Sequence, residues 1–332
     1  MSLRVVSAGP GLSVQDLGRP GHLAIGLGRG GAMDRLALAE GAALLGQAPG
    51  LAALEMAGMC GVFEAQADIR IALTGAPMRA RLNGQLLLWS ASHQVPAGAQ
   101  LEIGPVTAGS YGYLHLGGGI DARQRMGGRS AHIAAALGGL VVAGDVLEAG
   151  SSPGGPVGRV LTPKPRFAGG VIRLLPTAQS DDFGAELCGR LAKTAFKRDP
   201  RSNRQAVRLA FEGSGFALEG GLTVLSEITQ PGDVQITGDG VPVILMAEAQ
   251  TAGGYPRIAT VLPADLPWVA QAPAGAPLSF RWITIDEALL AERAPVSLHA
   301  RPLVRDPNEI ADLLSLQLIG GAVTGTEEED GK

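Results

Sequence analysis

Short runs in which apolar and polar residues alternate fill most of the chain. Ile69–Leu73, Val234–Thr237 and Leu278–Trp282 place apolar side chains at every second position, which is typical of half-buried β-strands. Further strands are expected at residues 85–89, 111–116, 171–175, 207–211 and 241–247. Asn83-Gly84 lies between two such runs, and this pair favours a two-residue hairpin turn. The pattern therefore predicts a mainly β protein.

Only a few segments have the pattern of a helix. Asp34 is a suitable N-cap for a helix that Gly46 would end, and Ser180 is expected to cap a second. Thr284 and Asp306 are each followed three residues later by glutamate, the spacing of a capping box. Because strands and helices do not alternate regularly, a doubly wound parallel sheet is disfavoured.

Turn-forming residues are abundant, with 49 glycines and 22 prolines among 332 residues. This composition favours many short elements joined by tight turns. The densest such stretch runs from residue 149 to residue 170 and contains four prolines. We therefore expect a domain boundary in this stretch.

The charge and cysteine content exclude several classes of protein. The net charge is −4, from 27 basic and 31 acidic residues, and no basic run is present; both facts argue against nucleic-acid binding. No apolar stretch approaches the ~20 residues needed to span a bilayer, and the first residues do not resemble a signal peptide. Cys60 and Cys188 are far apart, which excludes a disulfide scaffold and a cysteine-rich zinc site. A soluble cytoplasmic protein is expected.

Several short motifs are present without the surrounding elements that would give them a function. Gly26–Gly31 matches GxGxxG, but no long strand precedes it and the helix begins only after Asp34, so a plain glycine turn is favoured over a dinucleotide site. The five histidines show no i, i+4 pair, so we expect no metal site. Ser130 and His132 suggest a nucleophile with its base, but no GxSxG elbow accompanies them.

The segment Glu248–Arg257 is the strongest candidate for chemistry. It follows the very apolar run 243–246 and contains Gln250, Thr251 and the pair Gly253-Gly254. Adjacent glycines allow close approach of the backbone to a ligand and could form an anion nest. An ordinary turn remains an equal alternative, since glycines and polar residues favour turns.

Three other polar groups lie beside glycines or strands. Asp16 and Arg19 follow one another closely, and an ion pair between them is the simpler interpretation. Arg129 follows Gly127-Gly128, where a guanidinium could meet an anion. Asn203 and Arg208 flank the start of a strand, where a solvated face also explains them.

Four blocks identify a family that the chain resembles. They are Ser13–Arg19, Gly31–Asp34, Asn203–Leu209 and Gln250–Pro256, in the order found in carboxyltransferase A/B-type proteins. This family includes the KipA-like C component of bacterial 5-oxoprolinase, the allophanate hydrolase subunit 2 and part of the carboxyltransferase domain of urea carboxylase. The resemblance covers about residues 3–285. It implies two cyclophilin-like β-barrels with a few short helices, at residues 1–160 and 161–287, before a C-terminal helix and solvated tail at 288–332.

The resemblance also implies a function in a complex. The expected reaction is ATP-dependent opening of 5-oxo-L-proline, a small cyclic amide, to glutamate. Its expected partners are a KipI-like component and a LamB/YcsF-like component, the B and A members of the enzyme, with neither nucleic acid nor a membrane. One alternative is a biotin-dependent carboxyltransferase component acting in urea or allophanate chemistry. Another is a KipA-like regulatory protein that binds a kinase inhibitor.

The site residues follow from the polar segments and the resemblance together. Catalytic roles are expected for Gln250, Thr251, Arg129 and Asp34. Substrate binding is expected for Gly253, Gly254, Tyr255, Arg257, Asp16, Arg19, Asn203 and Arg208. The chain departs from the family pattern at Tyr111, Gly128 and Ala252, where Arg, Ser and Thr are usual. We expect the bend near residue 254 and the bend near residue 129 to line one shared hollow.

Overall fold

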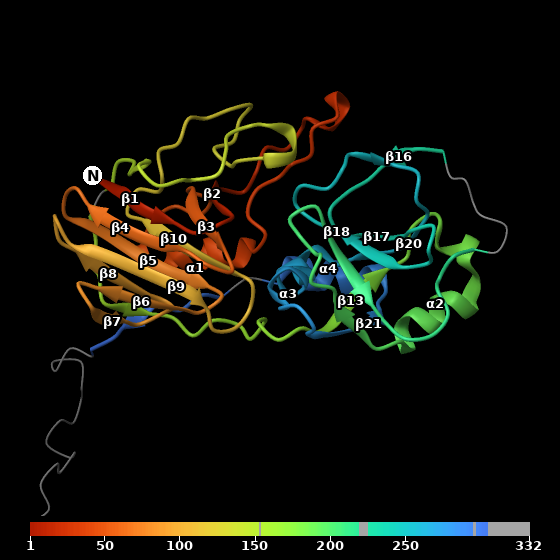
Figure 1. Cartoon of the computed structure of the whole chain (residues 1–332). Helices are drawn as coiled ribbons and strands as arrows, with labels where there is room; N and C mark the ends of the chain where they lie inside the picture. The colour runs from red at the N-terminus through yellow and green to blue at the C-terminus, as the bar shows by residue number, and fades with distance from the viewer. Residues whose placement is uncertain (153, 219–224, 295–296, 305–332) are drawn as a thin grey trace, which may run out of the picture.

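A computed structural model describes residues 1–152, 154–218, 225–294 and 297–304 of the chain. The strands before residue 161 and those from 170 to 282 form two lobes that lie side by side (Figure 1). We call them the N-terminal half and the barrel. The mainly β prediction is confirmed.

The N-terminal half consists of two antiparallel sheets. The first has the order β11-β1-β4-β9-β6-β7 and contains β1 (Ser2–Ala8), β4 (Gly61–Ala65), β6 (Met78–Leu82), β7 (Gln85–Leu87), β9 (Gln100–Val106) and β11 (Val146–Glu148). The second has the order β2-β3-β10-β5-β8-β12-β22 and contains β2 (Leu12–Gln15), β3 (Ala53–Ala57), β5 (Ile69–Gly75), β8 (Ala91–Val95), β10 (Tyr111–Leu116), β12 (Arg159–Val160) and β22 (Arg301–Pro302). Apolar side chains from both sheets, among them Phe63 and Leu114, form one buried core.

The predicted hairpin turn is confirmed. Asn83 and Gly84 join β6 to β7 with φ angles of 47° and 82°. Positive φ at both central residues matches the twist of the flanking strands, which is why this residue pair is favoured there.

The barrel closes on itself with the strand order β13-β20-β17-β18-β15-β14-β21. Its strands are β13 (Gly170–Leu175), β14 (Phe196–Arg198), β15 (Ala206–Ala210), β17 (Asp233–Ile236), β18 (Pro242–Leu245), β20 (Arg257–Val261) and β21 (Pro277–Trp282). β13 and β21 pair in parallel, whereas the other pairs are antiparallel. A separate two-stranded ribbon joins β16 (Glu227–Ile228) to β19 (Ala252–Gly253).

The short helices test the capping predictions. They are α1 (Arg35–Leu45), α2 (Gly184–Lys193), α3 (Leu266–Gln271) and α4 (Ile285–Arg293), with 3-10 turns η1 (Leu23–Ile25), η2 (Ile133–Ala135), η3 (Ser180–Phe183) and η4 (Pro263–Asp265). Asp34 caps α1, which Gly46 ends, and Thr284 forms a capping box with Glu287, as predicted. The helix expected from Asp306 lies outside the described residues.

The prediction that Ser180 caps a helix is wrong. Residues 180–183 form a 3-10 turn, and α2 begins only at Gly184, where φ is 68°. The Ser180 hydroxyl donates to the Ile258 carbonyl at 2.7 Å and accepts from the Thr177 amide at 2.8 Å. These bonds attach the turn to β20 instead of capping a helix.

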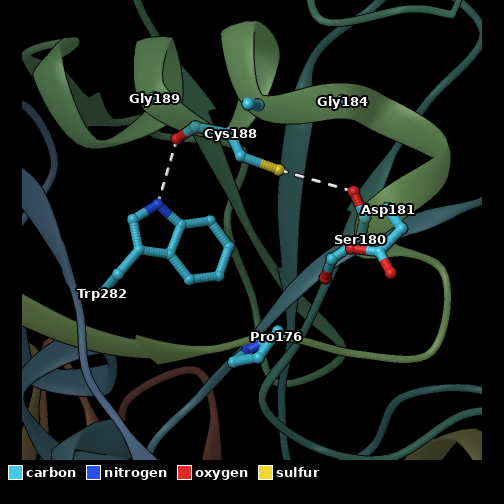
Figure 2. Close-up of a pocket in the computed structure, with 8 residues that line it drawn as sticks. Pro176, Ser180, Asp181, Gly184, Cys188, Gly189 and Trp282 are labelled. Atoms are coloured by element: carbon cyan, nitrogen blue, oxygen red, sulfur yellow. Dashed lines mark hydrogen bonds between the residues drawn. The ribbon is translucent and has the colours of Figure 1, made fainter.

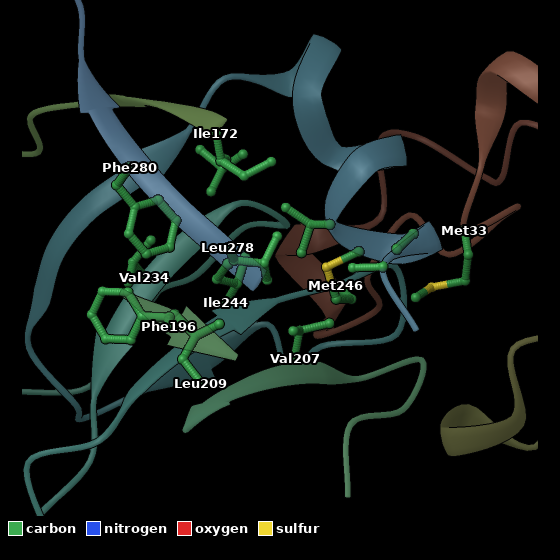
Figure 3. Packing of buried hydrophobic residues seen from close by; sticks show 14 of the residues in the cluster. Met33, Ile172, Phe196, Val207, Leu209, Val234, Ile244, Met246, Leu278 and Phe280 are labelled. Atoms are coloured by element: carbon green, nitrogen blue, oxygen red, sulfur yellow. The ribbon is translucent and has the colours of Figure 1, made fainter. Parts of the chain in front are cut away.

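The core of the barrel continues into the N-terminal half. Met33, Ala37 and Tyr113 belong to the same buried cluster as the barrel side chains. Figure 3 shows Met33 at the end of this cluster that faces Met246. The two halves therefore share apolar contacts, and residues at their junction are held in place from both sides.

The end of the described chain returns to the N-terminal half. β22 pairs with β12, and the Arg159 guanidinium donates to the Ala300 carbonyl at 2.9 Å. No helix in the described part of the chain has the length and apolar character needed to cross a bilayer.

Candidate functional site

The junction between the two halves contains a cavity of about 310 Å³. Residues 19–23, 27–29 and Arg35 line it from the N-terminal half, and residues 229–231, 247 and 249–251 from the barrel. Leu27 and Leu266 supply part of an apolar wall, while Gln250 and Thr251 offer neutral polar groups. A concave, partly apolar site with a few convergent polar groups is the usual form of a small-molecule site. We call it the junction cavity.

Three arginines line the junction cavity, and no aspartate or glutamate is among its described lining residues. Burial and the neighbouring Arg29 charge lower the pKa of Arg35 to about 10. Burial also lowers the pKa of Arg19. The charges of Asp16 and Glu248 act against the lowering at Arg19, but neither residue lines the cavity, so the three guanidinium groups give its wall a positive potential. The cavity is therefore suited to an anion.

Hydrogen bonds across the junction fix the loop 249–251. The Thr251 hydroxyl donates to the Gly26 carbonyl at 3.1 Å. The Gln250 amide donates to the Gln235 side chain at 3.2 Å, and the Gln250 carbonyl accepts from the Thr229 hydroxyl. Gln250 thus lies on the cavity wall with its side chain largely exposed. Its side-chain oxygen remains available to a ligand.

A buried ion cluster lies next to the junction cavity. Arg204 donates Nε to Glu248 Oε1 at 2.6 Å and Nη1 to Glu55 Oε1. Glu55 also accepts from the Tyr113 hydroxyl at 2.6 Å and the Met33 amide at 2.8 Å. The two carboxylates come from different halves, so Arg204 holds the loop after β18 against β3. Its pKa is raised because both carboxylates stabilise the cation.

The predicted shared hollow is wrong in both of its walls, because neither Arg129 nor Gly254 lines the junction cavity. Arg129 forms an ion pair with Asp121 at 2.7 Å and lines a different cavity, of about 380 Å³, together with Asp16. The guanidinium groups that line the junction cavity with Gln250 and Thr251 are those of Arg19, Arg29 and Arg35.

Asp16 and Arg19 do not pair with each other. Asp16 accepts from the backbone amides of Gly18 at 2.7 Å and Arg129 at 2.6 Å. Arg19 donates instead to the carbonyls of Arg125 and Ser130. Both residues therefore hold loop 125–130 against the loop that follows β2.

Asp34 is fully buried away from the cavity. It accepts from the Ala37 amide, from Arg166 at 2.7 Å and from Gln271 at 2.8 Å. Arg166 also binds Glu40 through two bonds of 2.8 Å. The contacts of Asp34 are those of a residue that caps α1 and joins the two halves. The catalytic role expected for Asp34 stays a prediction.

The segment 253–257 runs from the end of β19 to the start of β20. Neither Gly253 nor Gly254 has a positive φ. The backbone therefore lacks the succession of right-handed and left-handed residues that directs neighbouring N–H groups to one anion. Arg257 binds Glu227 and lies 3.4 Å from Asp233, and Tyr255 is half exposed. None of these four residues lines the junction cavity.

Asn203 and Arg208 lie at the start of β15. The Asn203 side chain accepts from the amides of Gln205 and Ala206, which forms a local turn. Arg208 pairs with Asp239 at 2.6 Å. The structure thus brings Arg19, Gln250 and Thr251 together and leaves the other predicted site residues elsewhere.

Sequence reasoning missed Arg29, Arg35 and the bridging residue Arg204. A signal for Arg29 was present, because residues 17–33 contain two arginines, Arg19 and Arg29, and no acid. Arg204 lies inside the family block Asn203–Leu209, but nothing beside it in the sequence indicates a bridging role. Its role depends on Glu55, which is 149 positions away.

A third cavity lies in the barrel beside α2 (Figure 2). It has a volume of about 430 Å³, and Cys188 and Trp282 are among its lining residues. The Trp282 indole donates to the Cys188 carbonyl at 3.0 Å. Burial raises the pKa of the Cys188 thiol, which keeps it protonated and a poor nucleophile. Across the described residues, no three His, Cys, Asp or Glu side chains gather to hold a metal ion.

Comparison with known families decides the classification. The family model "Carboxyltransferase domain, subdomain A and B" matches residues 25–282. The chain belongs to this family. Two relatives carry the name of the C component of 5-oxoprolinase: that of Escherichia coli is 34% identical and that of Haemophilus influenzae 33% identical. The matches cover 88% and 85% of this chain and 94% and 91% of those relatives.

Solved structures agree with the fold. The structure of TTHA0988 is 31% identical with a TM-score of 0.76 over 84% of this chain. The Kluyveromyces lactis urea carboxylase is 26% identical with a TM-score of 0.77 over 87% of this chain. The chain spans 55% of the first protein and 28% of the second. Both neighbours therefore extend beyond the part that this chain matches.

Proposed function

We propose that this protein is the C component of an ATP-dependent 5-oxoprolinase and that its junction cavity binds the anionic cyclic amide. The observation that carries the proposal is the cavity lining, which has three arginines, Gln250 and Thr251 but no described carboxylate. The 5-oxo-L-proline molecule has one carboxylate and one lactam. Arginines suit the carboxylate, and a side-chain amide suits the lactam.

The chemistry explains the use of ATP and of positive charge. A lactam is a poor electrophile, so phosphorylation of its oxygen before water attacks is a sensible use of ATP. That step develops negative charge on the phosphoryl and lactam oxygens, which positioned guanidinium groups stabilise. In this proposal Arg29 and Arg35 supply the positive charge, and Gln250 orients the ring. A KipI-like component and a LamB/YcsF-like component complete the enzyme.

The test is reconstitution of the complex. The chain is co-expressed with the KipI-like and LamB/YcsF-like proteins, and ATP-dependent glutamate release from 5-oxo-L-proline is measured. We expect release with the wild type and a loss of at least about tenfold in Arg35→Gln and Gln250→Ala, the scale of a lost charge-assisted hydrogen bond. Arg79→Gln, which removes an exposed charge from β6, is the matched control and should retain activity. Absence of release with all three proteins present contradicts the proposal.

The likeness to urea carboxylase supports a second candidate, a biotin-dependent carboxyltransferase component. Avidin separates the two because it sequesters biotin. Carboxylation of urea that requires a biotinylated carrier and is blocked by avidin would favour this candidate. Avidin-insensitive glutamate release would favour the 5-oxoprolinase.

A further inference from the structure

Unpartnered buried polar atoms concentrate at one place in the molecule. Six such side-chain atoms occur among the described residues, and four of them belong to Gln15, Arg19, Ser130 and His132. All four residues are more than nine-tenths buried. Buried polar atoms are almost always hydrogen-bonded, so a group of exceptions requires an explanation. We call these four side chains the polar cluster.

Short contacts show that the cluster is compact. Arg19 Nη2 donates to the Ser130 carbonyl, and Gln15 Nε2 donates to the Ala131 carbonyl at 3.2 Å. A Cβ added to Gly30 would lie 3.1 Å from the His132 ring and 3.6 Å from Arg19 Nη1. The ring and the guanidinium therefore border the same point beside Gly30.

Arg19 differs from two other buried arginines of the chain. Arg166 is bound by Asp34 and Glu40, and Arg204 by Glu55 and Glu248. Arg19 is 1% exposed, yet its described bonds are only to backbone carbonyls. Asp16 and Glu248 are near enough to act on its charge, but neither carboxylate binds it, and a buried guanidinium without a directly bonded anion is costly. This contrast indicates that Arg19 is prepared for an anion from outside the chain.

The remaining members define the chemistry of that anion. His132 Nδ1 accepts from the Ala135 amide at 3.3 Å, which places the proton of the neutral ring on Nε2. His132 Nε2, Ser130 Oγ and Arg19 Nη1 are then donors, and Gln15 Oε1 is an acceptor. Three donors and one acceptor suit an oxyanion that still carries a hydroxyl, as phosphate does near neutral pH.

The cluster lies behind the glycine loop 26–31, and this loop faces the junction cavity. Arg19 and Gly28 line that cavity. A Cβ on Gly28 would lie 3.7 Å from His132 Nε2 and 3.5 Å from the Ala249 carbonyl. The missing side chain thus leaves room directly in front of the unpartnered nitrogen. Gly26, Gly30 and Gly31 have positive φ, and such a loop has the backbone freedom to move aside.

We propose that the polar cluster is a subsite for a phosphate-class oxyanion, reached from the junction cavity by displacement of loop 26–31. Arg19, Ser130 and His132 donate to the oxyanion, and Gln15 accepts from its hydroxyl. The inference rests on the proposed function in one respect, because the subsite would hold the phosphoryl end of an activated substrate. Oxyanion binding is nevertheless measurable without turnover.

The experiment measures thermal unfolding and titration calorimetry of the isolated chain with inorganic phosphate, sulfate and acetate at equal ionic strength. We expect phosphate to raise the midpoint by at least about 2 °C at saturation. Sulfate and acetate should give less, because neither carries a hydroxyl for Gln15 near neutral pH. Gly28→Ala should fold normally, since its contacts are ordinary van der Waals distances, and should abolish the phosphate shift.

Two further variants and one control keep the test independent of folding. Ser130→Ala, and His132→Asn, which retains an acceptor for the Ala135 amide, should each weaken phosphate binding about tenfold. Gly104→Ala in β9 has similarly ordinary contacts and should retain the full shift. The control matters because phosphate and sulfate also stabilise proteins by exclusion from their surface.

The outcomes separate the subsite from the proposed function. Equal shifts in wild type and Gly28→Ala, or equal shifts from phosphate and sulfate, overturn the subsite. A phosphate shift that Gly28→Ala removes supports it, even where the reconstituted complex releases no glutamate. In that case the proposed function alone fails.

Discussion

The Arg204 guanidinium lies between Glu55 of the N-terminal half and Glu248 of the barrel and binds both. Its third contact is the Gly31 carbonyl at 2.8 Å, on the glycine loop itself. Glu248 additionally accepts from the Ala134 amide at 3.1 Å. One side chain thus holds the two halves together and anchors the glycine loop at its last residue, Gly31.

Removal of this charge should destabilise the protein strongly. Arg204→Met leaves two buried carboxylates without a cation, a change that costs about 3–5 kcal/mol in buried pairs. Urea unfolding measures the difference. Arg281→Met is the matched control, because Arg281 forms an exposed pair with Glu287 and such pairs contribute about 0–1 kcal/mol. Similar losses in the two variants would contradict the bridging role.

Replacement of either of two helical glycines by alanine should change the stability of the protein, and in opposite directions. A Cβ on Gly41 in α1 would lie 2.3 Å from the His115 ring, whereas a Cβ on Gly189 in α2 meets nothing within 4 Å. Gly189→Ala should therefore stabilise by about 0.5–1 kcal/mol through helix propensity. Gly41→Ala should destabilise by about 1–3 kcal/mol through overpacking. Thermal unfolding of both variants tests this, and stabilisation by Gly41→Ala would exclude the close packing of α1 on β10.

Buried His115 should make stability depend on pH. Burial lowers its pKa to about 3 from the ordinary value of 6.5. Between these values the unfolded chain binds a proton that the folded protein does not, so stability falls as the pH falls below 6.5. The expected slope from this residue is about 1 kcal/mol per pH unit between pH 6 and 5. Urea unfolding of His115→Gln across this range should give a shallower slope, and an unchanged slope would contradict a neutral buried ring.

Gln271 should be a sensitive position at the junction. It is fully buried, donates to Asp34 and the Tyr111 carbonyl at 2.8 Å each, and accepts from the Ser110 and Tyr111 amides at 3.0 Å each.

Gln271→Leu would remove the acceptor of the Ser110 and Tyr111 amides, at about 1–3 kcal/mol for each buried group. It would also remove one bond each from Asp34, which keeps Arg166, and from the Tyr111 carbonyl, which keeps the Ala76 amide. We expect a total loss of at least about 3 kcal/mol in urea unfolding. The exposed Gln94→Leu in β8 is the control and should change stability by less than about 0.5 kcal/mol. Equal effects would show that Gln271 does not join the halves.

The elements that the sequence predicted correctly have local causes. Asp34 and Gly46 bound α1, and Asn83-Gly84 forms a hairpin, because caps and turns depend on a few neighbouring residues. The prediction that Ser180 caps a helix failed because of a contact with a distant part of the chain. The Ser180 hydroxyl bonds to Ile258, 78 positions away, and no nearby residue indicates that competition.

The site was predictable only in part for the same reason. Gln250 and Thr251 were recognised from a polar segment after an apolar strand, and they do line the junction cavity. Arg129 was placed there by its position after two glycines, but its side chain turns to Asp121. Arg35 reaches the cavity from the first turn of α1. Which side chains meet across the junction depends on how the halves pack, and sequence spacing does not contain that information.

The pairing of β22 with β12 places the barrel inside the N-terminal half's own sequence, as an insertion between two adjacent strands. The barrel is thus attached to its neighbour by two separate stretches of polypeptide. A body with two covalent attachments swings less freely than one on a single linker, because each attachment limits the rotation that the other allows. Ligand entry at the junction is therefore expected to depend on small loop displacements, and cleavage between α4 and β22 should loosen the whole barrel.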